Sequence, residues 1–156
     1  MQGAIIDVVT DDKIPFQYFP PEITRQDSVE YASHRVVGKS SPVYKYISGG
    51  DRVVRFALSF SNENTVHDVE KQVSRLRALT YPETDGERVK SPPHPVILSC
   101  GDLFRDTAFL LLRINTRYHG LFDVDTNLPF AATVELTLVV HKKVNVDYKQ
   151  VRRFAE

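Results

Sequence analysis

The sequence predicts a mainly β (α+β) fold: two packed antiparallel sheets that form a β-sandwich or barrel, with one flanking α-helix. Several segments carry apolar residues at every second position, which is typical of strands. One segment alone has helical spacing, whereas a parallel sheet would need several crossover helices. The length of 156 residues suits a single domain with a core of its own.

Strands are expected where the alternation is clearest. Between Ala132 and Val140 the apolar residues at even positions share one face, and the threonines and Glu135 lie opposite. Between Leu110 and Tyr118 we also expect the even positions to share a face, with the apolar first half buried on both sides. Further strands are expected at Arg52–Phe60, Ala4–Val9, Phe16–Phe19, Val43–Ile47 and Val96–Cys100.

One helix of about three to four turns is expected among these strands. The residues that form one helical face are Val66, Val69, Val73, Leu76 and Leu79. Thr65 and Asp68 fit a capping box at the start of this helix, and Pro82 follows soon after its end.

The segments between these elements predict loops. Glu83–Pro95 is rich in polar residues and prolines and predicts an exposed connection, and His119–Pro129 predicts a long hairpin loop between two strands. Ser48–Asp51 is glycine-rich but lacks the Lys-Ser/Thr of a phosphate loop, so a turn is favoured. The basic tail Lys142–Glu156 is compatible with a helix, an arm or a frayed end.

Composition excludes several classes of protein. Acidic and basic residues balance at 20 each, which argues against a nucleic-acid binder that works by overall positive charge. A single cysteine, Cys100, cannot form an internal disulfide, so a stapled secreted domain is not expected. The N-terminus lacks the features of a signal peptide, and no apolar run approaches the roughly 20 residues that span a bilayer. We therefore expect a soluble protein made in a reducing cytoplasm.

Cys100 is the first residue to weigh as a catalytic candidate. It could act as a nucleophile with His94 and Asp102, which are near it in sequence. However, Cys100 continues the apolar run Val96–Leu98, which favours a buried packing role.

Metal sites are also not expected. Asp123–Asn127 resembles the start of a calcium loop, but Leu128 and Val134 stand where that loop needs Gly and Glu, so a solvated hairpin tip is favoured. The five histidines show no zinc-ligand spacing: His34, His67, His94, His119 and His141. We predict no enzyme activity, no cofactor and no metal.

Five short segments occur in an order that suggests a family. They are Phe16-Gln17-Tyr18-Phe19-Pro20-Pro21-Glu22, Ser48-Gly49-Gly50 before a strand, the helix Asp68–Leu79 with its Arg75-Leu76-Arg77 end, Pro92–Gly101, and Phe122–Ala131. Together, from about Ile14 to Val144, the chain resembles the tube proteins of contractile injection systems and the tube initiators of phage baseplates. Phe19, Cys100, Asn127 and Phe130 depart from the family's usual Asn, aromatic residue, Gly and Arg.

The resemblance implies a tail-tube fold over residues 1–144 and a C-terminal arm over 145–156, without the LysM domain that many relatives carry. It implies a structural virion protein of a contractile tail baseplate, forming a hexameric ring that links the hub protein to the tail tube protein and initiates tube assembly. Sheath or wedge proteins are further expected partners, DNA only passes through the lumen, and no membrane is involved. The particle would be assembled in the host cytoplasm.

In such a ring the exposed strand edges become the bonding surface between copies. The candidate interface residues are Ser48, Gly49, Gly50, Phe122, Asp123, Asp125, Pro129 and Phe130. We expect His119–Pro129 and Lys39–Gly50 to be ordered mainly by assembly. The alternatives are an ordinary tail tube subunit and a soluble β-barrel ligand-binding domain, which would need a large apolar pocket within one subunit.

Overall fold

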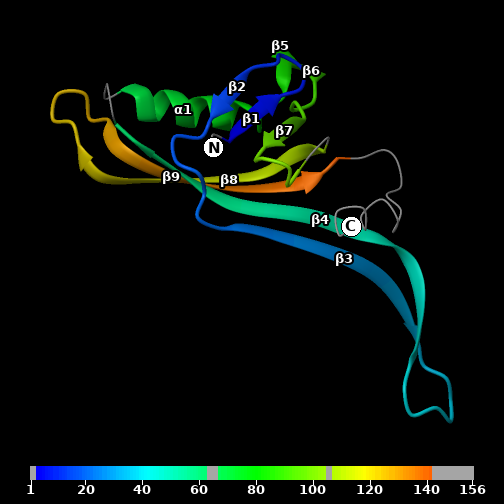
Figure 1. Ribbon diagram of the computed structural model, residues 1–156. Helices are drawn as coiled ribbons and strands as arrows, with labels where there is room; N and C mark the ends of the chain where they lie inside the picture. Colours follow the sequence, from blue (N-terminus) through cyan, green and yellow to red (C-terminus); the bar gives the residue numbers. More distant parts are fainter. Residues whose placement is uncertain (1–2, 63–66, 105–106, 142–156) are drawn as a thin grey trace.

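The structure, a computed structural model, describes residues 3–62, 67–104 and 107–141 (Figure 1). It is mainly β with one helix, as the sequence predicts. In chain order the elements are β1 (Ala4–Asp7), β2 (Lys13–Pro15), β3 (Ile23–His34), β4 (Val43–Ser61), α1 (His67–Ala78), β5 (Glu83–Asp85), β6 (Arg88–Ser91), β7 (Val96–Ser99), β8 (Ala108–Phe122) and β9 (Pro129–Val140). The expected cap at Thr65 and the tail 142–156 lie outside the described residues.

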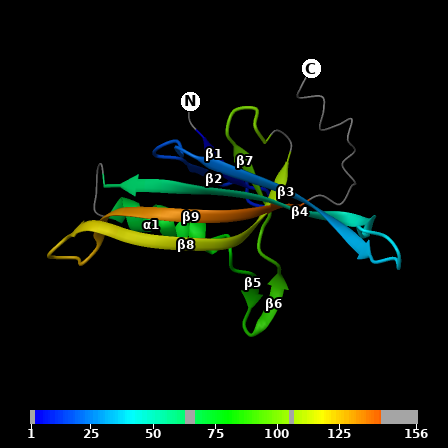
Figure 2. The ribbon, with the colours of Figure 1, turned by 90° about the horizontal axis from the view of Figure 1, so that it is seen from below.

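Seven of the strands form one antiparallel sheet in the order β2-β1-β7-β8-β9-β4-β3, and β5 pairs with β6 in a separate hairpin. The β7–β8 pairing is short and joins Val96 and Ile97 to Phe109 and Ala108. Beyond this short pairing, a covering layer lies over one face of β8, β9 and β4, and it consists of β1, β2, β7 and α1 (Figures 1 and 2). The two expected layers are therefore parts of one hydrogen-bonded sheet, and the described strands do not close into a barrel.

The hydrophobic core lies between these two layers. On β9 the even positions from Ala132 to Leu138 are buried, which confirms the predicted alternation. Val54, Phe56, Leu58 and Phe60 of β4 are buried in the same way. The covering layer contributes Ile5, Ile14, Val69, Val73, Leu76, Val96 and Leu98. Burial of alternate residues on one face leaves the opposite face of β8, β9 and β4 open.

The helix is attached to both layers by polar contacts at its rim. Arg75 binds the carboxylate of Asp12 at 2.6 Å and donates to the carbonyl of Lys13 at 2.9 Å. The Tyr118 hydroxyl donates to Glu70 at 2.9 Å. Because Tyr118 reaches α1, its side of β8 is the helix-covered side.

The prediction of which residues share a face of β8 is wrong for the first half of the strand. A register shift between Leu111 and Arg113 marks a bulge at Leu112. Phe109 and Leu111 are buried, whereas Leu112 is 60% exposed. A bulge adds one residue to one strand and reverses the alternation beyond it, so Ile114 returns to the covered side.

Strand β4 is longer than expected. The two predicted strands 43–47 and 52–60 are one continuous strand, and Ser48–Asp51, predicted to be a turn, lie inside it. Ser48 and Gly49 pair with Glu30 and Val29 of β3. Around this stretch, β4 has two more residues than the paired part of β3. The glycines therefore accommodate bulges within β4 and do not end the strand.

Two further predictions fail near the N-terminus. Phe16–Phe19 is not a strand, because pairing with β1 ends at Pro15 and the Phe16 ring packs on Phe56 with centroids 5.9 Å apart. Strand β3 was not predicted at all. It has few apolar residues and is exposed along most of both faces, so it lacks the usual alternation signal.

Two predicted loops are also shorter than expected. The connection 83–95 contains the β5–β6 hairpin, which is exposed as predicted. The segment 119–129 is mostly strand, because β8 continues to Phe122 and Phe122 pairs with Pro129 at the start of β9. Only residues 123–128 form the loop.

Candidate assembly interface

The four-stranded part of the sheet has two free edges among the described residues. β3 is the last strand of the sheet and pairs only with β4. β8 pairs with β9 along its length, but β7 covers only Ala108 and Phe109 on its other side. From Leu110 to Phe122 the outer edge of β8 therefore has no strand beside it. Unpaired edges present rows of free N–H and C=O groups to another chain.

The two free edges are staggered. Ile23 of β3, Phe56 of β4, Leu136 of β9 and Ile114 of β8 lie in one row of paired residues. Beyond this row β8 runs on to Phe122 at one end of the molecule, and β3 runs on to His34 at the other (Figure 1). The free edges thus overhang at opposite ends.

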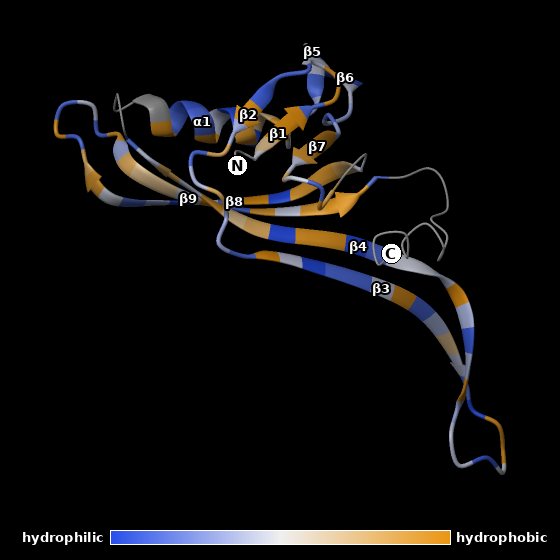
Figure 3. Ribbon diagram, in the orientation of Figure 1, coloured by the Kyte–Doolittle hydropathy of each residue, from blue (hydrophilic) through white to orange (hydrophobic). Residues whose placement is uncertain are grey.

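The overhang of β3 and β4 is a hairpin, residues 28–50, that we call the arm. It extends away from the two layers (Figures 1 and 2). On one face, Val29, Tyr31, Tyr44 and Tyr46 are between 49% and 66% exposed, and the rings of Tyr31 and Tyr46 lie 6.1 Å apart. Figure 3 shows the arm mostly in white and blue, with a few separate orange bands. We call these four residues the tyrosine face.

The tyrosine face continues the covered side of the sheet. Ile23, Arg25 and Asp27 of β3 pair with Phe56, Val54 and Arg52, on the side where the core lies. The extra residues are all on β4, so the alternation of β3 runs unbroken to Val29 and Tyr31. In the arm nothing among the described residues lies over this side. Exposed aromatic clusters of this kind mark interaction surfaces.

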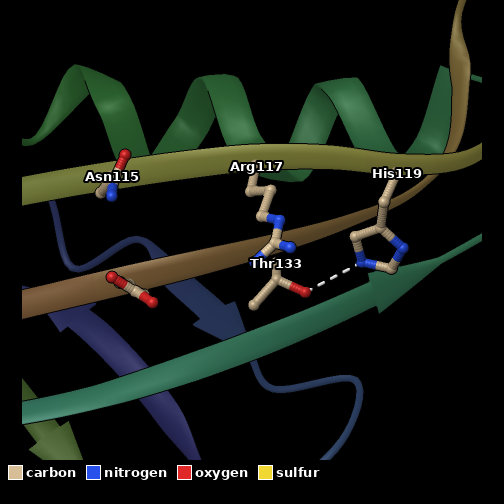
Figure 4. A pocket seen from close by; sticks show the side chains of 5 residues that line it. Asn115, Arg117, His119 and Thr133 are labelled. Carbon is tan, nitrogen blue, oxygen red and sulfur yellow. Dashed lines mark hydrogen bonds between the residues drawn. The ribbon is translucent and has the colours of Figure 1, made fainter.

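The opposite, open face of the sheet is polar. Asn115, Arg117 and His119 of β8 lie beside Thr133 and Glu135 of β9 and line a shallow depression of about 460 Å³ (Figure 4). The His119 Nε2 and the Thr133 hydroxyl are 2.9 Å apart. Polar side chains with charges of both signs suit a wet surface, not an apolar ligand pocket.

The candidate interface residues fall into two groups at opposite ends. Ser48, Gly49 and Gly50 lie in the arm, where a side chain at Gly50 would collide with Ser28. The other five gather where β8 meets β9: Phe122 and Asp125 are exposed, Asp123 and Phe130 are half-buried, and Pro129 is buried. Sequence reasoning missed the tyrosines and the edges of β3 and β8. The spacing of Tyr44 and Tyr46, which places both on one side of a strand, could have indicated the exposed tyrosines.

Asp123 organises the loop between β8 and β9. Its carboxylate accepts hydrogen bonds from the Thr126 hydroxyl at 2.9 Å and from the amide of Asp125 at 3.2 Å. Asn127 has a φ of +56°, a conformation that Asn tolerates where the family has Gly. The carboxylate is thus used within the turn, in keeping with the predicted hairpin tip. No group of three potential metal ligands occurs in residues 3–62, 67–104 and 107–141.

His94 connects the β5–β6 hairpin to the rest of the chain. Its Nδ1 lies 2.9 Å from Asp7 and its Nε2 lies 3.1 Å from Glu83. The hydrogen bond to Asp7 raises the pKa of His94, against the effect of its partial burial. Burial would raise the pKa of Asp7, but hydrogen bonds from His94 and the amides of Val9 and Thr10 lower it. An imidazolium can donate to both carboxylates at once.

Cys100 is buried, which confirms its predicted packing role. Burial raises the pKa of its thiol and disfavours the reactive thiolate. None of the described helices could span a membrane.

Comparison with known proteins gives similarity to solved structures and no match to a family model or curated protein. Among solved structures, a chain in the cryo-EM structure of the anti-feeding prophage baseplate, sixfold symmetrised, is similar with 12% identity and a TM-score of 0.43. The match covers 90% of this chain and 88% of that chain.

Proposed function

We propose that this protein is a structural, non-catalytic subunit whose copies join into a ring through their sheet edges. The β3 edge of one copy pairs with the β8 edge of the next. The observation that carries this proposal is the pair of free edges on one sheet, overhanging at opposite ends of the molecule.

Strand direction allows this pairing without turning a copy over. β8, β9, β4 and β3 alternate in direction because each neighbouring pair is antiparallel. Four alternating strands place β3 antiparallel to the β8 of a copy in the same orientation. The free length of β8, Leu110–Phe122, is close to that of β3, Ile23–His34. A regular stagger is what tilted strands need to close a barrel.

The ring would also cover the tyrosine face. α1 lies on the covered side of β8, where Tyr118 reaches Glu70. When β8 of a neighbour joins β3, the neighbour's α1 is placed on the same side as Val29, Tyr31 and Tyr46. Closure would pair both free edges of the four-stranded part of the sheet, and the open polar face would become the inner surface. Arg55, Arg113 and Arg117 outnumber Glu135 on that face, so the inner surface would be positive on balance and would attract DNA.

The resemblance of the sequence to tube initiators supports a specific role. We propose a hexameric ring of the virion, in the baseplate of a contractile tail, that links the hub protein to the tail tube and starts tube assembly. Residues 1–144 would be the ring-forming domain, and 145–156 a terminal arm. An ordinary tail tube subunit remains the second candidate. The ligand-binding barrel is disfavoured because the described strands stay open and the depression on the sheet is polar.

The first experiment measures mass by light scattering and shape by electron microscopy on the purified chain. Closed rings of about six copies are expected. A chain that stays monomeric at high concentration contradicts the proposal. Long tubes from the chain alone favour the ordinary tube subunit over the initiator.

A second experiment tests which edges pair. Gln26 and Asn115 are exposed residues of β3 and β8, on the open face. A chain with Gln26→Cys and Asn115→Cys should give a ladder of cross-linked species that ends at the closed ring. Either cysteine alone should give no ladder. Rings that form without the ladder would show that other surfaces join the copies.

A further inference from the structure

A second hollow lies on the covering layer, where residues of β2, the end of α1 and the start of β5 meet (Figure 1). We call it the cleft. Its volume of about 490 Å³ is in the range of pockets that bind ligands. The buried side chains of Ile14 and Leu79 and the 60% exposed ring of Tyr81 belong to its lining. The cleft therefore offers apolar surface to an incoming side chain.

The charged groups of the cleft are negative on balance. The lining has three carboxylates, on Asp7, Asp12 and Glu83, against the guanidinium of Arg75 and the imidazole of His94. One negative charge is thus in excess when His94 is protonated, and two when it is neutral. The side chains of Asp12 and Glu83 are 55% and 51% exposed, so both carboxylates can accept a further cation from solvent.

The segment that follows β9 has a composition that matches the cleft. Residues 142–156 contain five basic residues and two acidic ones. Arg152 and Arg153 precede Phe154, which places two guanidinium groups next to an aromatic ring. Guanidinium groups bind carboxylates through paired hydrogen bonds, and an aromatic ring gains from burial against apolar surface.

This segment also starts beside the cleft. His141, the residue before it, donates its amide to the carbonyl of Ala108 at 2.8 Å. Ala108 pairs with Ile97 of β7, and His94 precedes Ile97 by three residues. Phe154 is thirteen residues beyond His141. Because an extended chain covers up to about 3.3–3.6 Å per residue, the segment is long enough to reach the cleft.

Two other surfaces of the sheet fit a basic segment less well. The open face has an excess of arginine side chains, so it repels such a segment. The loop of the arm, residues 35–42, carries Arg35 and Lys39 and no acidic residue, so it repels the segment too. Charge therefore favours the cleft over both.

We propose that the cleft binds a basic segment with an aromatic side chain, and that its occupant is residues 142–156 of the same chain. Arg152 and Arg153 then bind the exposed carboxylates of Asp12 and Glu83, and Phe154 covers the apolar lining. The segment straps the end of β9 to the covering layer, next to the short β7–β8 pairing. The described residues of the cleft belong to neither β3 nor β8, so this inference does not rest on the proposed ring.

Photo-cross-linking from the segment tests the contact directly. The full chain is made with p-benzoylphenylalanine in place of Phe154, which keeps an aromatic side chain at this position. After irradiation, mass spectrometry should find the cross-links at Ile14 and at residues 78–83, which line the cleft. Cross-links that fall mainly outside the cleft overturn the proposal.

Isotope labelling shows which chain supplies the segment. Heavy-labelled and unlabelled chains, each with the photoreactive residue, are mixed before they can assemble. The cross-linked peptide pairs should be wholly heavy or wholly light at every protein concentration. Pairs that combine a heavy and a light peptide at the cleft would place the segment on another copy, which overturns the proposed contact within one chain.

Charge reversal then tests the cause. Arg152→Glu with Arg153→Glu should lower the yield of cleft cross-links about tenfold, because attraction to the carboxylates becomes repulsion. High salt should also lower the yield. Arg35→Glu with Lys39→Glu is the matched control, because it changes the net charge equally but in the arm. A yield that ignores the first pair of changes, or falls equally with both pairs, contradicts the proposal.

Light scattering on the same samples separates this inference from the proposed ring. Rings that show the cleft cross-links support both. Monomers that show these cross-links keep the bound segment and remove the ring. Rings whose cross-links avoid the cleft keep the ring and remove the bound segment.

Discussion

Strands β3 and β4 run through both the two packed layers of this protein, which we call the body, and the arm, yet the two parts are stabilised differently. In the body, β4 buries every second residue from Val54 to Phe60 beneath the covering layer. In the arm, the same strand pairs only with β3, and the residues from Val43 to Gly49 are all exposed. A two-stranded hairpin is marginal in water on its own. The arm is therefore the part whose stability we expect to depend on a partner.

The largest expected effect is a loss of stability of the body after a substitution in its core. Leu136 and Leu138 are fully buried on β9. Leu136→Ala should lower the free energy of unfolding by about 2–5 kcal/mol, because it removes buried methyl groups and leaves a cavity. Urea unfolding followed by circular dichroism measures this loss. A loss as small as that of an exposed substitution would contradict the assigned core.

A tyrosine substitution should break assembly and spare the body. Tyr46→Ala removes a ring that is 66% exposed and pairs with the ring of Tyr31, so the free energy of unfolding should fall by no more than about 1 kcal/mol. Ring formation by light scattering should weaken strongly, because the lost aromatic surface is covered only in the ring. Ala32→Ser, on the opposite face of the arm, is the matched control. Equal effects of the two changes would argue against a tyrosine-face contact.

Gly49 and Gly50, which are neighbours in the arm, allow a more specific test in which a smaller effect is expected. A Cβ at Gly50 would meet Ser28, including its backbone carbon at 2.9 Å, whereas a Cβ at Gly49 has open space. Gly50→Ala should destabilise the arm by about 1–3 kcal/mol, as overpacking does. Gly49→Ala should be nearly neutral. Hydrogen exchange of the β3 and β4 amides in the arm distinguishes the pair, and similar exchange in both variants would contradict the bulged pairing.

The smallest effect is expected at the β5–β6 hairpin and depends on pH. The pKa of His94 is raised above its ordinary 6.5, so its contribution is complete below that pH and is lost as pH rises through the folded-state pKa. The pKa of Asp7 is lowered below 3.8, so its contribution is complete above that pH and is lost as pH falls through the folded-state pKa. Protection factors for amide exchange of residues 83–91, which remove the intrinsic pH dependence of exchange, should be largest between these limits.

His94→Gln is the control for this pH effect. The variant should show smaller protection factors in the hairpin at pH 5 and protection factors that do not change at higher pH, because no imidazolium is present. Protection factors that still fall above neutral pH in the variant would assign the effect to another group.

Prediction from the sequence worked where a strand has one buried face. The alternation in β9 and in the second half of β4 indicated both the strand and its buried side, because half-buried sheets impose a period of two. The helix was found from its spacing for the same reason. Prediction failed at Leu112 and at Ser48–Asp51. At these places bulges and glycines interrupt the alternation of side chains, although backbone pairing continues the strand.

The candidate site was only partly visible in the sequence. Gly50, Phe122 and Asp125 were singled out, but nothing in the sequence places the first at one end of the molecule and the others at the opposite end. β3 was missed because an edge strand exposed on both faces has no hydrophobic period to detect.

By itself, the sequence determined the mainly β class, the single helix, the buried Cys100 and the residues of the core, because burial of one face leaves a periodic pattern. Only the tertiary structure decided which edges remain free, how far the arm projects and which charged residues line the cleft. Those properties depend on pairing between segments far apart in the chain, and backbone hydrogen bonds leave no mark on side-chain periodicity.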